Sequence, residues 1–473
     1  MKKEISKRQL DMLHGSIWNK LPLFALPVAA TAILEQLFNA SDIAVVGNFT
    51  GTGKTIAVAA VGANSSIIAL IVNLFVGIAL GANVIIANAI GRDDREAVQK
   101  TVHTSIVVAI LCGILVAAAG ELIAAPLLSS LLVPEDVLPS ALLYLRIYLL
   151  GMPVILLYNF EAAIFRSVGN TRTPLIALFA SGILNVVLNL FFVAVLRMTV
   201  NGVAIATVLS NAVSSMLLFR RLRTTQQSIH VEWQALRIDW TTLKRIMRVG
   251  LPAGIQSAVF AVSNIVIQSA INSLGTVVMA ASSAAFNIEV FAYDILNSFS
   301  QACTTFVGQN YGAGQLGRCK RTLILCLFED LTASASAIAL VLLAGKQLLA
   351  IFNSNPDVIS IGYTRLLIVF SAYTFSMLYE VMSGYLRGFG ISLVPAILTA
   401  IGVCGVRIGW INFVFPQIRT FQTILIAYPV SLSATALLIL IALLCYRPSR
   451  RFATLQRGEK NLNTNKEKNL WPH

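Results

Sequence analysis

Long runs of apolar residues follow one another from residue 18 to residue 446 of this 473-residue chain. Each run is close to the roughly 20 residues that a helix needs to cross a bilayer. The runs lack the alternation of apolar and polar positions that is typical of membrane strands. We therefore predict an all-α, polytopic membrane protein with about twelve transmembrane helices. These start near residues 18, 56, 101, 139, 173 and 202, and again near 246, 277, 321, 358, 392 and 421.

Composition supports a membrane protein. The chain is 57% hydrophobic and only 12% charged, with a mean hydropathy of +0.78. A soluble globular domain carries about 25% charged residues. The partner that this composition predicts is the lipid bilayer.

The chain also repeats itself, because several residue pairs recur in one order at spacings of 219 to 225. Six helices return a chain to the side where it started. We therefore predict two parallel, pseudo-symmetric six-helix bundles about an axis along the membrane normal, with a cleft between them. The recurring pairs are Leu26-Pro27 with Leu251-Pro252, Asn39 with Asn264, Tyr144 with Tyr363, Arg146 with Arg365, Glu161 with Glu380, Arg166 with Arg387, Gly169 with Gly390 and Pro174 with Pro395.

The net charge of +14 comes from basic clusters at both ends of the chain and in its middle. Basic residues mark cytoplasmic segments, so both termini and the middle linker are expected in the cytoplasm. This placement explains the charge without a nucleic-acid partner. The predicted divisions are a cytoplasmic N-terminal segment (1–17), an N-terminal lobe (18–222), a cytoplasmic linker (223–244), a C-terminal lobe (245–446) and a disordered cytoplasmic tail (447–473).

The first apolar run carries a polar stripe that includes Glu35, Asn39 and Asp42. Helical residues three or four apart share a face. A carboxylate in hydrocarbon costs about 2.5 to 3.5 kcal/mol on insertion scales, so this face is expected to line a protected or watery cavity. A carboxyl there would bind a proton and release it when the cavity opens to water. We predict that the stripe holds the coupling ion.

Other polar positions are candidates for a substrate cleft, each with a purely structural alternative. Glu161 and Glu380 also fit structural pairing with Arg166 and Arg387, and amides between helices often make packing hydrogen bonds. Phe260 stands where Glu35 stands in the other half, which suggests a coupling ion in the N-terminal half and a shared substrate. The cleft candidates are Glu289, Gln256, Phe260, Asn264, Glu161 and Glu380.

No known catalytic or metal-binding motif appears in the sequence. The four histidines are scattered, and the six cysteines lack metal-ligand spacing. We find no His-Glu-x-x-His and no Gly-x-Ser-x-Gly motif. We therefore expect a protein that is not an enzyme and has no cofactor.

Several stretches resemble the multidrug and toxic compound extrusion (MATE) family of transporters. They are Phe306-Val307-Gly308-Gln309-Asn310-Tyr311-Gly312-Ala313-Gly314, Leu386-Arg387-Gly388, Ala40-Ser41-Asp42 and Leu184-Asn185-Val186-Val187-Leu188-Asn189. The resemblance covers nearly all of residues 20–445. It implies an antiporter that expels amphipathic, often cationic, organic compounds in exchange for protons or sodium.

The resemblance also implies an inner cation site in the first half. Its residues match Asp42, Asn185 and Thr207, and a possible sodium site would include Asn189. The family has a second acid where this chain has Asn189. We hypothesise that Glu35 compensates for it.

Alternatives remain open at this point. A lipid-linked oligosaccharide flippase has a related architecture, but it would need a cationic cleft for a pyrophosphate. A channel would need no two-lobed design. We expect a monomer in a bacterial cell membrane, and the sequence leaves the substrate and the coupling ion undecided.

Overall fold

The computed structural model describes residues 9–50, 54–130 and 133–452, and within these ranges it contains helices and no strand. Ten helices there are long and apolar enough to cross a membrane, and twelve spans result if each of two bent pairs counts as one. The predicted all-α membrane fold with about twelve spans is confirmed. Parts of the predicted N-terminal segment (1–8) and cytoplasmic tail (453–473) lie outside the described residues.

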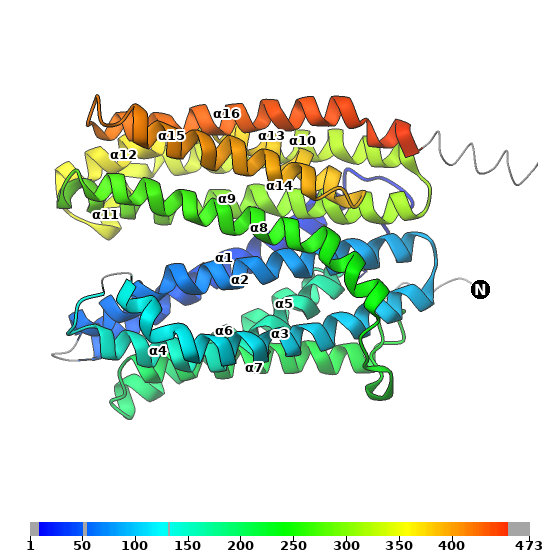
Figure 1. Ribbon diagram of the computed structural model, residues 1–473, viewed down its shortest axis with the longest axis horizontal. Coiled ribbons are helices and arrows are strands. Elements are labelled where there is room, and N and C mark those ends of the chain that lie inside the picture. Colours follow the sequence, from blue (N-terminus) through cyan, green and yellow to red (C-terminus); the bar gives the residue numbers. More distant parts are fainter. Residues whose placement is uncertain (1–8, 51–53, 131–132, 453–473) are drawn as a thin grey trace, which may run out of the picture. The chain divides into compact units, whose positions relative to one another are not determined.

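The described part of the first half contains seven α-helices (Figure 1). The fourth span is broken: its two parts meet at Gly151 with a bend of 51°. Pro153 is the second residue of α5, two residues after this glycine, and a proline at the start of a helix lacks the N–H that would continue the preceding one. The elements are α1 (Lys20–Phe49), α2 (Lys54–Gly91), α3 (Arg95–Ser130), α4 (Leu138–Leu150), α5 (Met152–Ser167), α6 (Arg172–Leu190), the π-helix η2 (Phe191–Val195), α7 (Val200–Thr224) and the 3-10 turn η3 (Trp233–Ala235).

The second half has the same kind of broken fourth span, with a bend of 44° at Ala372. Its fifth span also contains a π-helix. The elements are α8 (Trp240–Asn272), α9 (Thr276–Gly312), α10 (Leu316–Leu343), α11 (Gly345–Phe352), α12 (Pro356–Ser371), α13 (Tyr373–Gly388), α14 (Leu393–Thr399), η4 (Ala400–Gly405), α15 (Val406–Phe413) and α16 (Phe421–Tyr446).

The structure corrects one part of the predicted repeat. Helices α5 and α13 are both 16 residues long, and their first and last residues lie 221 apart. Each is followed by a glycine with φ of +80°, Gly169 and Gly390. This register places Glu161 opposite Met382, so the predicted match of Glu161 with Glu380 is wrong by two residues. The sequence alignment matched two glutamates by residue type. This match requires a two-residue insertion within the helix, but α5 and α13 are continuous helices of equal length.

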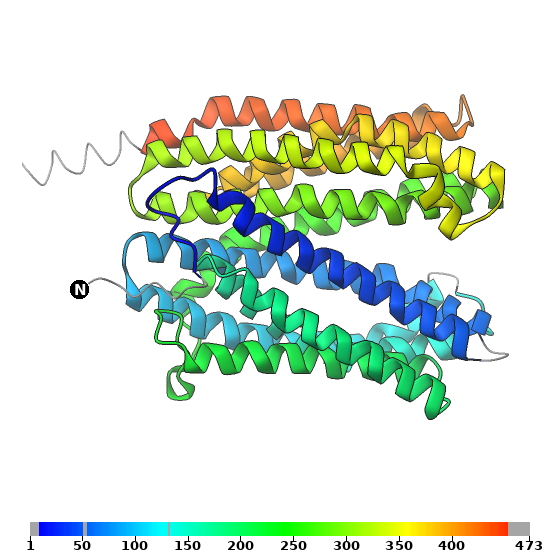
Figure 2. The ribbon, with the colours of Figure 1, turned by 180° about the vertical axis from the view of Figure 1, so that it is seen from behind.

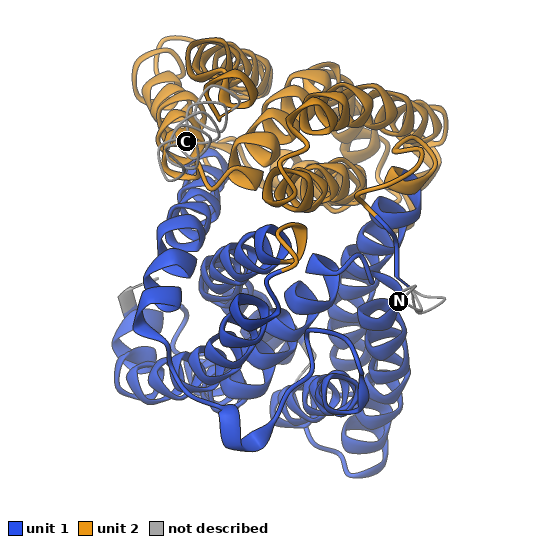
Figure 3. Ribbon diagram, turned by 90° about the vertical axis from the view of Figure 1, so that its right-hand side faces the viewer, with its two compact units in different colours: residues 1–11, 22–89, 94–268 blue, residues 12–21, 90–93, 269–473 orange. Residues whose placement is uncertain are grey.

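Two compact units divide the described residues, and neither is a continuous stretch of chain (Figure 3). Unit 1 comprises 1–11, 22–89 and 94–268, and unit 2 comprises 12–21, 90–93 and 269–473, in each case as far as the chain is described. Most of α8 therefore packs with the first half.

Glycines explain why α8 joins unit 1. A Cβ atom on Gly77 would lie 2.2 Å from the backbone N of Gly254, and one on Gly81 would lie 2.7 Å from the Cα of Gly250. Two small-xxx-small pairs thus bring the backbones of α2 and α8 into contact. Close packing of this kind replaces the hydrophobic effect as the force that joins helices in a bilayer.

The segment before α1 is held by unit 2. Arg318 donates to the carbonyl oxygens of Gly15 and Met12, at 3.0 and 3.1 Å. The ring of Trp18 packs on Phe328 with centroids 5.6 Å apart. Arg318 follows the glycine-rich end of α9, and its planar guanidinium can serve several acceptors at once.

Candidate functional site

Asp42 lies on α1 where that helix meets α6 and α7. Helix α1 runs beside α6 (Figure 2), and Phe38 packs at Gly182. A Cβ atom on Gly182 would lie 1.7 Å from the Phe38 ring, so only glycine leaves room for it. This close approach brings the next turn of α1, which carries Asp42, within reach of side chains from α6 and α7.

Four side chains form a closed ring of hydrogen bonds around the carboxyl group of Asp42. Its Oδ1 accepts from Nδ2 of Asn189 at 2.5 Å, and its Oδ2 accepts from Oγ1 of Thr207 at 2.9 Å. Asn189 also donates to Oδ1 of Asn185 at 3.1 Å, and Nδ2 of Asn185 donates to Thr207 at 3.4 Å. Asn185 and Asn189 are four residues apart on α6, so they share one face.

The ring is buried except at Thr207. Asp42 is 4% exposed, Asn185 4% and Asn189 0%, whereas Thr207 is half-buried. Two phenols of α4, Tyr144 and Tyr148, lie within electrostatic range of Asp42. Polar side chains at membrane depth are costly and usually serve function, so this ring is the strongest candidate site in unit 1.

The other residues of the predicted stripe lie apart from the ring. Glu35 and Asn39 are exposed, and the charge of Arg166 on α5 acts on Glu35. Tyr148 is within electrostatic range of Glu35 as well as Asp42. Glu35 is therefore a neighbour of the Asp42 ring and makes no hydrogen bond to it within the described residues.

The π-helix η2 begins two residues after Asn189, with Phe191. Short π-helical segments inside α-helices are rare and are frequently found at functional sites. The wider turn changes the direction in which the end of this span presents its side chains. The site residues Asn185 and Asn189 thus sit directly before an irregular segment.

In unit 2, Glu289 is held by an arginine. Nε and Nη2 of Arg365 donate to its two carboxylate oxygens at 2.7 and 2.9 Å, and Nη1 donates to Ser282 at 2.6 Å. Arg365 is 2% exposed and Glu289 is 3% exposed. This buried, bidentate salt bridge links α9 and α12 and has a structural role. Arg407, for which the sequence offers Glu289, Glu380 and Asp294 as possible anionic partners, donates to Ser431 at 3.1 Å and lies over the ring of Tyr428.

The remaining cleft candidates are distributed over both units. Glu380 pairs with Arg387 at 3.1 Å, whereas Glu161 accepts from Ser215 at 2.9 Å. On α8, Gln256 is buried and both Phe260 and Asn264 are half-buried; all three belong to unit 1.

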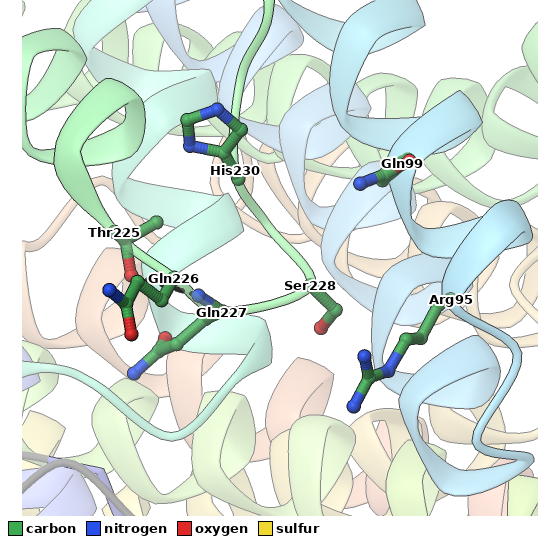
Figure 4. A pocket seen from close by; sticks show the side chains of 7 residues that line it. All are labelled: Arg95, Gln99, Thr225, Gln226, Gln227, Ser228 and His230. Carbon is green, nitrogen blue, oxygen red and sulfur yellow. Dashed lines mark hydrogen bonds between the residues drawn. The ribbon is translucent and has the colours of Figure 1, made fainter.

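A cavity of about 350 Å³ in unit 1 has none of these residues in its lining (Figure 4). The cavity lies between the start of α3 and the segment that follows α7, and no predicted site residue lines it. Among the described residues, no three His, Cys, Asp or Glu side chains come close enough to hold a metal ion. The cavity is lined by Arg95, Gln99, Thr225, Gln226, Gln227, Ser228 and His230.

Comparison with known proteins decides the family. The family model MatE matches residues 27–191 and 252–414, which is one match in each half of the chain. The chain belongs to the MATE family. This double match confirms the resemblance seen in the motifs and the two-half organisation of the sequence. Membership of a transporter family also confirms that the protein is not an enzyme.

Curated relatives of this MATE protein are similar over nearly their whole length. A probable multidrug resistance protein of Bacillus subtilis, YoeA, is 24% identical over 433 residues, covering 90% of this chain and 93% of the relative. A probable multidrug resistance protein of Thermotoga maritima, NorM, is 27% identical over 424 residues, covering 86% and 87%. The relatives are thus bacterial proteins named for multidrug resistance.

Solved MATE structures share the fold. A crystal structure of MATE in complex with MaL6 has a TM-score of 0.86 at 20% identity, covering 93% of this chain and 98% of the other. An outward-facing multidrug resistance MATE transporter has a TM-score of 0.84 at 20% identity, covering 93% and 98%.

The MATE resemblance predicted that the four residues of the Asp42 ring lie together, and the structure places them together. The sequence analysis did not identify the two phenols near this ring. Tyr144 and Tyr148 are four apart on α4, a spacing that puts both phenols on one face toward Asp42. This spacing of four residues was the feature of the sequence that could have identified the two tyrosines as neighbours of the site. The partner of Glu289 had no comparable signal, because α9 and α12 are joined only by tertiary packing.

Proposed function

We propose that this MATE protein is a secondary active antiporter that exports amphipathic, cationic organic compounds in exchange for protons by alternating access. The ring around Asp42 carries this proposal. It supplies one buried carboxyl group whose charge can change without covalent chemistry. Proton loss would change the charge that a cationic substrate meets, so the proton and the substrate compete.

The hydrogen bonds of Thr207 support a carboxyl group that exists in two charge states. The single hydroxyl proton of Thr207 has two acceptors within reach, Oδ2 of Asp42 at 2.9 Å and the carbonyl oxygen of Val203 at 3.0 Å. Ionised Asp42 accepts from Thr207 and Asn189. Protonated Asp42 donates to Thr207, whose own proton then turns to Val203. A hydroxyl rotation is enough to serve both states.

The relatives support the substrate class. Several are named multidrug resistance or multidrug export proteins, including those of Bacillus subtilis, Pseudomonas aeruginosa and Staphylococcus saprophyticus. The basic clusters support a bacterial cell membrane location with both termini in the cytoplasm. We propose that the protein works as a monomer, since each half supplies one lobe.

Sodium is the second candidate for the coupling ion. Carboxylate, amide and hydroxyl oxygens come together in the ring, and hard cations prefer oxygen ligands. Oδ1 of Asn189 is buried and, among the described residues, makes no hydrogen bond. This spare oxygen is the observation that favours sodium at Asp42, Asn185, Asn189 and Thr207.

The test is efflux of a fluorescent cationic dye from proteoliposomes under a pH gradient or a sodium gradient, each imposed alone. We expect dye movement under the pH gradient, and none in Asp42→Asn protein that is folded and inserted. Asp94→Asn is the matched control, because exposed Asp94 only caps the start of α3 through its bond to Ala97, which asparagine can keep.

Each other outcome has one meaning. Movement only under the sodium gradient would replace the proton by sodium. Wild-type coupling in Asp42→Asn would overturn the role of the ring. No dye movement under either gradient would overturn the antiporter proposal and favour a lipid-linked oligosaccharide flippase, and steady ion current without dye would favour a channel.

A further inference from the structure

Unit 2 contains a second group of buried ionisable side chains, which the Asp42 ring does not involve. Asp330 lies on α10, whereas Glu380 and Arg387 lie on α13, which packs against α10. Asp330 is 0% exposed and Glu380 7%. Carboxylates at membrane depth are stable only when they are paired, hydrated or neutral.

Arg387 neutralises Glu380. Nη2 of Arg387 donates to Oε2 of Glu380 at 3.1 Å, and the hydroxyl of Tyr293 donates to Oε1 at 3.3 Å. Both oxygens of Glu380 therefore have a donor. The carboxyl group of Glu380 is thus paired with one positive charge.

Asp330 has no such balance. Its Oδ1 accepts from the hydroxyl of Ser334 at 2.8 Å, while its buried Oδ2 receives no hydrogen bond from any described residue. Its electrostatic partner is Glu380, which carries the same charge. An uncompensated charge buried beside a like charge is strongly destabilising, so two interacting carboxyls with one guanidinium cannot both be ionised.

The basic side chains of α11, α12 and α15 contact other groups. Arg407 on α15 donates to Ser431 and lies over the ring of Tyr428. Lys346 on α11 lies over the ring of Tyr363, and Arg365 on α12 is bound by Glu289. Other ionisable side chains of α10 and of the helices packed against it include Cys326 and Glu329 of α10, Cys303, Tyr293 and Asp294 of α9, and Tyr379, Glu380 and Arg387 of α13, and the charge of Arg407 acts on Tyr379.

From this arrangement we propose that Asp330 is a second proton-carrying carboxyl, so that one transport cycle exchanges two protons, one at Asp42 and one at Asp330. The inference rests on the proposed proton antiport. In this proposal the proton resides on Oδ2 of Asp330, the oxygen that receives no hydrogen bond from any described residue. When the cycle admits water, the O–H bond breaks, the proton passes to water, and the negative charge stays on Asp330. The buried Nε of Arg387, which has no acceptor among the described residues, is the donor that α13 offers to a second carboxylate.

The test is the steady dye gradient that a fixed pH gradient supports in proteoliposomes with the membrane potential clamped at zero. Exchange of two protons per dye at one unit of pH gradient supports a dye ratio of about 100, and exchange of one proton supports about 10. We expect about 100 for the wild type and about 10 for Asp330→Asn. A ratio of about 100 in Asp330→Asn would overturn the inference and leave the antiporter intact. Asp42→Asn tests the antiporter separately, because the proposed function has the substrate and the proton compete at Asp42.

Glu329→Gln is the matched control. Glu329 adjoins Asp330, and both of its carboxylate oxygens are buried without a hydrogen bond among the described residues. We expect it to stay neutral throughout, so Glu329→Gln should keep a ratio of about 100. A drop to about 10 in this variant would assign the second proton to Glu329 and overturn the role of Asp330.

A second measurement needs no asparagine variant. With carbon-13 in aspartate carboxyls, the infrared band of protonated aspartate should decrease by two groups on substrate binding in the wild type. In Asp330→Glu, which keeps a carboxyl group, the labelled band should decrease by one group. A decrease of one group in the wild type would contradict the inference even if Asp330→Asn fails to fold.

Discussion

Nδ2 of Asn189 lies 2.5 Å from Oδ1 of Asp42, across 147 residues of chain. In this MATE protein Asn189 occupies a position at which the family pattern has an acid. The amide gives the carboxylate a donor instead of a repelling charge. Under the proposed function, coupling in unit 1 depends on one carboxyl group and on the hydroxyl that bonds its other oxygen.

Thr207→Val should slow proton-coupled efflux. Valine keeps the shape of threonine but removes the hydroxyl that donates to Oδ2 of Asp42 at 2.9 Å. Loss of one donor to a buried carboxylate costs about 1–3 kcal/mol, which corresponds to a decrease in rate of about 5-fold to 150-fold. The measurement is dye efflux under a pH gradient. Thr207→Ser keeps the hydroxyl and should stay close to wild type; an equal loss in both variants would exclude the hydroxyl as the cause.

Removing one partner of the Arg365–Glu289 pair should destabilise unit 2. Two hydrogen bonds of 2.7 and 2.9 Å hold the pair, and both residues are buried. A buried charge left alone costs about 3–5 kcal/mol, so Glu289→Gln and Arg365→Met should each lower the unfolding temperature in detergent. The double variant Arg365→Met with Glu289→Met should recover most of the loss. If the two single losses simply add, the pair is not an energetic unit.

Gly77→Ala should destabilise the contact between α2 and α8. The added Cβ would lie 2.2 Å from the backbone N of Gly254, so the helix backbones would have to separate. Overpacking of this kind costs about 1–3 kcal/mol, measurable as a lower unfolding temperature. Gly62→Ala on the same helix is the control: its Cβ would meet nothing within 4 Å, and alanine should gain about 0.5–1 kcal/mol of helix stability. Equal effects of Gly77→Ala and Gly62→Ala on the unfolding temperature would contradict a close contact between α2 and α8 at Gly77.

The start of α8 should loosen at acid pH. Oδ1 of Asp239 accepts from the backbone N of Thr242 at 2.7 Å, and hydrogen bonds from the side chain and backbone of Thr242 lower the pKa of Asp239 below its ordinary 3.8. The contribution to stability is therefore complete above pH 3.8 and is lost as the pH falls through the lowered pKa. Hydrogen exchange at the Thr242 amide, corrected for the intrinsic rate, should show protection that decreases in this range. Asp239→Asn can accept at any pH and should show no such decrease.

The sequence-based alignment of the two halves was right where glycine and proline fix the backbone, and it failed in a helix interior. Gly169 and Gly390 share a φ of +80°, a conformation that glycine adopts without strain, so their match reflects geometry. Glu161 and Glu380 matched only by residue type. One accepts from Ser215 and the other pairs with Arg387, and the two lie two residues out of register.

The sequence by itself determined the all-α membrane fold, because the bilayer requires about 20 apolar residues per span wherever that span lies in the structure. It also determined the family and, through the family motifs, the residues of the Asp42 ring. Only the tertiary structure decided which carboxyl groups have partners. The ties between Glu289 and Arg365 and between Glu380 and Arg387, and the missing donor at Asp330, depend on which helix faces pack together. Helix packing in a bilayer follows from close contacts of small residues and from a few hydrogen bonds, and residues distant in sequence supply both sides of each contact.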